Sequence, residues 1–80
     1  MKTYNWKDNE TAECFYYYRE EDGRIVGQTN KIAHTKIWLS KIMLSSNEEQ
    51  YLGQYIDLIH SKKAIEVFWL IQERTLLEQS

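Results

Sequence analysis

The sequence predicts an α+β domain in which an antiparallel meander of three to four strands packs against one C-terminal helix. Three observations predict this fold. Short segments rich in aromatic and β-branched residues occupy the middle of the chain, with polar turns between them. An Asp-Gly dipeptide joins the first two of these segments. A long segment with helical periodicity follows the last one and begins directly after an aspartate.

The length and composition predict a single small domain. Its 80 residues divide into an N-terminal arm over 1–13, a sheet over 14–56 and a helix over 57–78. Chains of this size bury only about 60% of the surface of their unfolded state, so we expect a partner or a second copy to add stability. The first residues lack a secretory apolar region, and no apolar run approaches the roughly 18 residues of a spanning helix. These features predict a cytoplasmic protein with no membrane partner.

The first hairpin is predicted from its turn. Residues 14–20 are dense in aromatic side chains, which favour a pleated surface. Asp22-Gly23 follows, and this dipeptide between two such segments is a strong hairpin signal. The return strand covers 24–29, and Gly27 inside it indicates a bulge or a close approach of the backbone to another element.

Two further strands are predicted over 37–44 and 50–56, on either side of a polar turn. The first of them places Ile37, Leu39 and Met43 on one face and Trp38, Ile42 and Leu44 on the other. Apolar residues on both faces indicate an inner strand, or a strand that has one face against a partner.

The C-terminal helix is predicted to begin after Asp57 and to end near Glu78. The carboxylate of Asp57 can accept hydrogen bonds from the backbone amides two and three residues later, as an N-cap does. Helical periodicity predicts a sheet-facing stripe, with Glu66 and Glu73 on the opposite side. The stripe consists of Ala64, Phe68, Ile71 and Thr75, flanked by Ile65, Val67, Gln72 and Leu76.

Two leucines on the opposite side of the helix have no role in covering the sheet. Leu70 and Leu77 lie seven residues apart, and with Trp69 they would form an apolar patch. Such patches usually mark an interface, so these three residues are our candidates for self-association. The alternative is that they are ordinary surface leucines, which are common.

The sequence contains no recognisable arrangement of catalytic or metal-binding residues. Cys14 is the single cysteine, and neither His34 nor His60 has a carboxylate or thiol at metal-ligand spacing. The sequence contains no nucleophile elbow and no glycine-rich phosphate loop. We therefore expect a protein that is not an enzyme and that has no catalytic residue, metal or cofactor.

Tyrosines of two predicted strands are expected on the sheet face that points away from the helix. They are Tyr16 and Tyr18 of the first strand and Tyr51 and Tyr55 of the last. Residues 23–44 add four cations and no acid. The candidate contact residues of this face are Arg24, Lys36, Trp38, Lys41, Tyr51 and Tyr55. Three alternatives remain: nucleic-acid binding by stacking and phosphate pairing, a protein interface, or rings that only shield the sheet.

Residues 24–71 resemble the DNA-binding domain of the plant ethylene-response-factor type and its relatives in phage integrases and homing endonucleases. The resemblance is carried by Trp38, Tyr51-Leu52-Gly53-Gln54-Tyr55, Asp57 and Lys63-Ala64-Ile65, with residues 24–29 as the first strand. It implies a three-stranded sheet followed by one helix, with DNA contacts from the sheet. That family contacts the major groove through arginines and tryptophans, whereas the last strand of this chain carries no basic residue.

Two classes of function follow from these features. The first is a small non-catalytic interaction module of the accessory kind found in phage and bacterial genomes, which forms a homodimer or binds a protein partner. The second is nucleic-acid binding through the sheet face. A net charge of −2 and few basic residues predict that duplex binding would be weak and steeply salt-dependent.

Overall fold

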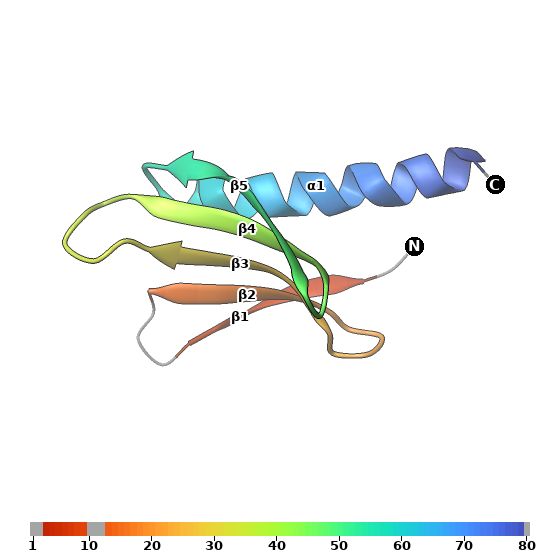
Figure 1. Cartoon of the computed structure of the whole chain (residues 1–80), viewed down its shortest axis with the longest axis horizontal. Coiled ribbons are helices and arrows are strands. Elements are labelled where there is room, and N and C mark those ends of the chain that lie inside the picture. Colours follow the sequence, from red (N-terminus) through yellow and green to blue (C-terminus); the bar gives the residue numbers. More distant parts are fainter. Residues whose placement is uncertain (1–2, 10–12, 80) are drawn as a thin grey trace.

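The residues that the structure describes form five antiparallel strands and one helix (Figure 1). The structure is a computed structural model that describes residues 3–9 and 13–79, with side chains up to Thr75. Its elements are β1 (Tyr4–Asp8), β2 (Cys14–Arg19), β3 (Ile25–Lys31), β4 (Trp38–Ser45), β5 (Glu48–Tyr55) and α1 (Leu58–Gln79). The strands form one sheet in the order β1-β2-β3-β4-β5, and α1 lies across one of its faces. The predicted α+β meander with a C-terminal helix is confirmed.

The sheet has more strands than predicted, because the predicted N-terminal arm contains β1. This strand pairs with β2 over its whole length, from Tyr4 opposite Arg19 to Asp8 opposite Phe15. The ring of Tyr4 stacks on Tyr17 of β2 with centroids 5.2 Å apart, and the ring of Trp6 packs against Tyr17 in a tilted arrangement with centroids 4.7 Å apart. Cross-strand ring pairs of this kind stabilise a short strand that has little β signal of its own. The other residues of the predicted arm, 1–2 and 10–12, lie outside the described part of the chain.

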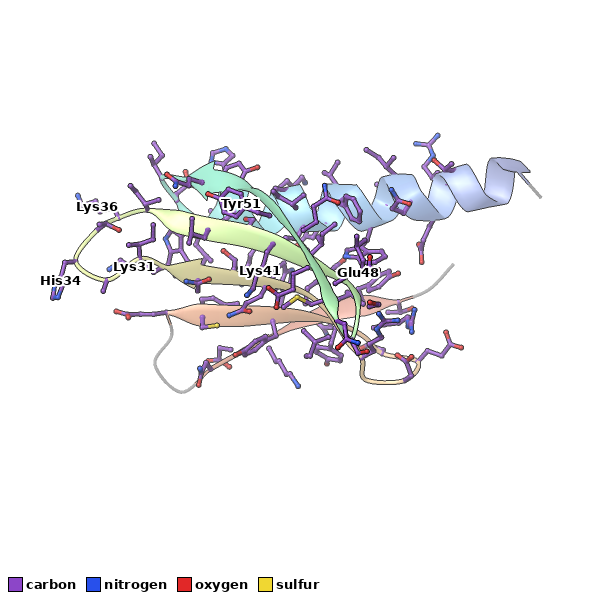
Figure 2. The ribbon with its side chains drawn as sticks, viewed as in Figure 1. Lys31, His34, Lys36, Lys41, Glu48 and Tyr51 are labelled. Atoms are coloured by element: carbon purple, nitrogen blue, oxygen red, sulfur yellow. The ribbon has the colours of Figure 1, made fainter. Side chains whose placement is uncertain are left out.

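The sheet has an inner face toward α1 and an outer face on the other side, and residues alternate between them along each strand. The cross-strand register assigns the outer face to Asn5, Lys7, Cys14, Tyr16, Tyr18, Ile25, Gln28, Asn30, Leu39, Lys41, Met43, Glu49, Tyr51 and Gln54. Tyr16 and Tyr18 therefore point away from the helix, as predicted. No described element covers this face (Figure 2).

The helix approaches the sheet most closely at Gly27 of β3. A Cβ atom at this position would lie 2.5 Å from Cγ2 of Ile65, which is closer than carbon atoms pack. The register between β2 and β3 also shifts beside Gly27 and leaves Val26 as the extra residue of a bulge. Val26 and Ile65 are fully buried at this contact. The sequence indications of a bulge and of a close approach are both confirmed.

Three hydroxyl groups are buried where the first turns of α1 meet the sheet. Thr29 of β3, Ser40 of β4 and Ser61 of α1 have no exposed surface. The Ser61 hydroxyl is hydrogen-bonded to the hydroxyls of Thr29 and Ser40, and the Ser40 hydroxyl also donates to the Ser61 carbonyl over 2.8 Å. Because buried hydroxyls without partners are costly, this cluster favours one register of the helix on the sheet.

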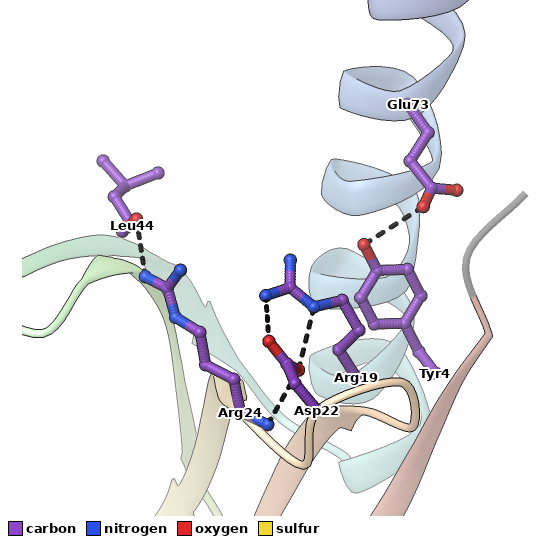
Figure 3. Close-up of polar contacts among 6 residues, drawn as sticks. All are labelled: Tyr4, Arg19, Asp22, Arg24, Leu44 and Glu73. Carbon is purple, nitrogen blue, oxygen red and sulfur yellow. Dashed lines mark hydrogen bonds and ion pairs between the residues drawn. The ribbon is translucent and has the colours of Figure 1, made fainter.

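The side of α1 that faces the sheet differs from the predicted one. The indole N–H of Trp6 donates to Glu66 over 2.8 Å, and the Tyr4 hydroxyl donates to Glu73 over 3.1 Å (Figure 3). Both glutamates, predicted on the opposite side, therefore face β1. Ile71, predicted in the sheet-facing stripe, is 55% exposed. Apolar residues occur on every side of this helix, so periodicity alone does not determine its rotation.

The predicted N-cap is confirmed. Oδ1 of Asp57 accepts a hydrogen bond from the backbone amide of His60 over 2.8 Å, and Oδ2 lies 2.7 Å from Nδ1 of the His60 ring. The amide hydrogen bond is the main cause that lowers the pKa of Asp57 from its usual value. Over its described length, α1 lacks the length and apolar character that crossing a membrane requires.

Candidate interaction surfaces

Large apolar side chains are exposed along one side of α1. The described part of the chain exposes seven large hydrophobic residues, and five of them belong to α1 or directly precede its cap. These five are Ile56, Ile59, Val67, Leu70 and Ile71, and we call them the helix ridge. Ile56 and Ile59 are the most exposed, at 82% and 77%. Exposed apolar side chains that gather on one side of a helix usually mark an interaction surface.

Val67, Leu70 and Ile71 form the densest part of the helix ridge. Their spacing of three and four residues places them on adjoining turns of the helix. The C-terminal turns that follow them project past the strands of the sheet (Figure 1). Lys63 and Arg74, both exposed, lie four residues from Val67 and Leu70 and border this apolar surface. Their charged ends can stay in water while their aliphatic stems cover apolar groups.

The predicted self-association patch agrees only in part with the helix ridge. Leu70 is exposed and belongs to it. Trp69 does not, because its ring stacks on Tyr4 at 6.2 Å and its indole N–H donates to the carbonyl of Val26 over 3.0 Å. The side chain of Leu77 lies outside the described part of the chain. The other four ridge residues were not among the candidates. Val67 and Ile71 were predicted to face the sheet, and Ile56 and Ile59 were not assigned to the patch.

A line of aligned side chains crosses the outer face from one edge of the sheet to the other. Each residue is the direct cross-strand partner of the next, so all five strands contribute one residue. The residues are Lys7, Tyr16, Gln28, Lys41 and Tyr51, and we call them the central row. Tyr51 is 55% exposed, and Figure 2 shows it with Lys41 on neighbouring strands. Two phenol rings thus flank an amide and an ammonium group.

The two ammonium groups of the central row have different surroundings. Nζ of Lys41 lies 3.2 Å from Oε2 of Glu49, which is exposed, so the pair is open to solvent. Nζ of Lys7 lies over the ring of Tyr18, 5.5 Å from its centroid. A solvent-exposed ion pair of this kind contributes little stability, so Lys41 can exchange its partner for another anion at low cost.

Trp38 and Tyr55, both predicted as contact residues, do not lie on the outer face. They are cross-strand partners on the inner face, where Trp38 lies 6.0 Å from the ring of Phe15. Trp38 lies three residues from Lys41 on β4, so alternation places the two on opposite faces. For Tyr55 the reason is a register shift in β5: Ser40 pairs with Gly53, while the next residue of β4, Lys41, pairs with Tyr51. This bulge puts Tyr51 and Tyr55 on opposite faces, although strict alternation would keep them together.

Arg24 and Lys36, the other predicted contact residues, lie at opposite ends of the sheet. Nη2 of Arg24 donates to the carbonyl of Leu44 over 2.9 Å and so joins the β2–β3 turn to the end of β4 (Figure 3). Lys36 is exposed in the β3–β4 loop at the other end, close to Lys31 and His34 (Figure 2). Of the six predicted contact residues, only Lys41 and Tyr51 are therefore brought together on the outer face, whereas Trp38 and Tyr55 pair on the inner face.

The end of the sheet that carries Arg24 is rich in acids. Arg19 and Asp22 form an ion pair of 2.5 Å across the turn, and the hydrogen bonds from Arg19 hold the pKa of Asp22 well below its usual range (Figure 3). Glu20, Glu21 and Glu48 are exposed at the same end. These acids would repel an anionic partner, so the outer face favours such a partner near the β3–β4 loop and disfavours it near these turns.

The described residues contain no candidate metal site. Among them, no three metal-ligating side chains come together. Burial raises the pKa of Tyr4 and of Tyr17 to about 12, with Glu73 and Glu66 respectively adding to the effect. A hydrogen bond with Cys14 likewise raises the pKa of Tyr16. These shifts keep the phenols protonated, and their causes are structural contacts.

Comparison of the chain with protein-family models, with curated proteins and with solved structures found no significant match in any of the three.

Proposed function

We propose that this protein is a non-catalytic interaction module that self-associates through the helix ridge. The observation that supports the proposal is the distribution of exposed apolar side chains: five of the seven in the described chain belong to this ridge. Removing such a surface from water is favourable at about 25 cal/mol per Å². The sheet cannot provide that burial, because it packs against the opposite side of α1.

A second copy of the chain is the partner that best fits the ridge. In a two-fold dimer the same patch contacts itself, so an apolar ridge on one protomer meets an apolar ridge on the other. From Ile59 to Ile71 the helical part of the ridge is about 18 Å long at 1.5 Å per residue, a length over which two helices can pack side by side. Lys63 lies between Ile59 and Val67 on the same side of the helix, so its ammonium group must reach out of the contact into water. Arg74 lies beyond Ile71 at the rim, where charged side chains are usual. A small domain also has the most stability to gain from such a dimer.

Sedimentation over a range of concentrations tests the proposal. The wild-type mass should rise from that of a monomer to that of a dimer with increasing concentration. Leu70→Lys should remain monomeric, because it places an ammonium group in the centre of the apolar contact. Leu44→Lys is the matched control, since Leu44 is 40% exposed and Leu70 is 46% exposed, but Leu44 lies on β4.

The control should dimerise as the wild type does, and thermal melts of both variants should show that they fold. A wild-type mass that stays monomeric at every concentration would contradict the proposal. So would a dimer that Leu70→Lys leaves intact, because the contact would then lie elsewhere.

A further inference from the structure

We propose that the central row of the outer face binds single-stranded nucleic acid, a function beyond self-association through the helix ridge. The row combines three kinds of group that such a ligand requires. Phenol rings can stack on bases, ammonium groups can pair with phosphates, and amides can hydrogen-bond to base edges. All three occur side by side on an uncovered face of the sheet.

The rings of the central row are spaced to hold more than one base. Tyr16 on β2 and Tyr51 on β5 are separated by two strands, or about 14 Å at 4.8 Å per strand step. Tyr18 lies two residues from Tyr16 on the same face, so the outer face carries three phenol rings. A base gains stability by stacking on such rings whatever its identity, which favours a ligand whose bases are not already stacked in a duplex.

The charges of the central row fit a single strand better than a duplex. Lys7 and Lys41 are its two cations, so only about two phosphates are neutralised, whereas tight duplex binding uses six to ten. The chain also has a net charge of −2, which disfavours a long polyanion. Stacking must therefore supply most of the affinity, and duplex bases do not expose their faces for stacking.

Amide groups within the central row and next to it can contact base edges. Gln28 lies between Tyr16 and Lys41 within the row. Asn30 and Gln54 lie on either side of Leu39 in the neighbouring line of the same face. Side-chain amides carry both a donor and an acceptor and so match the edges of unpaired bases.

In the unbound protein, Glu49 competes with the ligand for Lys41. Its carboxylate pairs with Lys41, so a phosphate must displace it. The acidic turns beyond Glu49 repel the ligand, and Lys36 in the β3–β4 loop at the opposite end attracts it. The strand of nucleic acid should therefore leave the central row toward the β3–β4 loop.

Fluorescence anisotropy with 5′-labelled 12-nucleotide dT and U oligomers at low salt tests the inference. Both should bind with micromolar affinity, and the comparison of the two shows whether the sugar matters. Tyr51→Leu should weaken binding at least about fivefold, and Tyr51→Phe should retain it, because a stacked ring contributes roughly 1–3 kcal/mol. If both variants lost binding, the phenol hydroxyl would be required, and the stacking argument would be wrong.

The charges provide a second, matched pair of variants. Glu49→Gln should tighten binding, because it releases Lys41, whereas Glu48→Gln removes the same charge one residue away and should change binding less. The slope of log K against log salt should be about −1.4 for two phosphates and should fall in magnitude by about 0.7 in Lys41→Gln.

Three outcomes would overturn the inference: no binding at tens of micromolar protein, tighter binding to a duplex of the same length, or equal effects of the two glutamate substitutions. The monomeric Leu70→Lys variant should bind the oligomers with the wild-type intrinsic affinity, because the helix ridge is on the other side of the sheet. Failure of this inference and failure of self-association are therefore distinguished by different variants.

Discussion

Gly27 of β3 and Ile65 of α1 are in contact with no room for a Cβ atom between them. This contact places the helix directly on the backbone of the central strand, and the fully buried Val26 lies next to it. The absence of one side chain at Gly27 therefore determines how deeply α1 sits on the sheet.

Gly27→Ala should lower the free energy of unfolding by about 1–3 kcal/mol, the usual cost of adding a methyl group to a packed core. Urea denaturation followed by circular dichroism measures this difference. In an Ile65→Ala background the same substitution should cost less, because the atom that it meets is gone. Additive costs in the double variant would contradict a direct contact between the two residues.

The buried hydroxyl cluster should behave as one unit. Ser61→Ala leaves the hydroxyls of Thr29 and Ser40 without their shared partner and should cost about 1–3 kcal/mol. The triple variant Thr29→Val, Ser40→Ala and Ser61→Ala removes all three hydroxyl groups and should cost less than the sum of the three single substitutions. Urea denaturation of the four variants gives the comparison, and strict additivity would show that the hydroxyls do not depend on each other.

The N-cap of α1 should make stability depend on pH in the acid range. Because folding lowers the pKa of Asp57, its charged form stabilises the fold above the pKa of the unfolded chain, and this contribution is lost as pH falls through the folded pKa. Melting temperatures of Asp57→Asn, which keeps a capping oxygen without the charge, should fall less between pH 5 and pH 2 than those of the wild type. Because folding also lowers the pKa of Asp22, that residue contributes to the loss of stability at acid pH in both proteins, and the two melting temperatures are therefore compared at each pH.

The tyrosines that hold β1 should resist deprotonation. In the folded protein the pKa of Tyr4 and of Tyr17 is about 12, against an ordinary value of 10.0. The stabilisation is complete below the unfolded pKa of 10.0 and is lost as pH rises toward 12. Absorbance at 295 nm should show a late titration step that Tyr4→Phe and Tyr17→Phe each reduce. Persistence of the late step in urea would contradict its dependence on the fold.

Much of the strand arrangement could be predicted because the signals are local. Asp22-Gly23 marks the first hairpin, and Gly23 has the positive φ of 71° that its turn requires. Alternation along 14–20 separates Phe15 from Tyr16 correctly. The strand β1 was not predicted, because the ring contacts of Tyr4 and Trp6 with Tyr17, which favour its pairing with β2, form only in the folded chain.

The candidate sites were harder to predict, because each depends on a distant contact. Tyr55 was assigned to the outer face by alternation, but the bulge in β5 moves it to the inner face. Trp69 was assigned to an exposed patch, but the free carbonyl of Val26, more than 40 residues away in sequence, accepts its indole N–H. The residues that surround Tyr55 in the chain do not reveal the bulge, and the residues that surround Trp69 do not reveal its contact with Val26.

By itself the sequence determined the fold class, the first hairpin and the start of the helix, because turn residues, strand alternation and the capping aspartate act over a few neighbouring positions. Only the tertiary structure decided which side of α1 is left uncovered and which side chains align across the outer face. Those outcomes depend on the close approach at Gly27, on the buried hydroxyl cluster and on two bulges. All of these arise from contacts between strands and a helix that the chain brings together only when it folds.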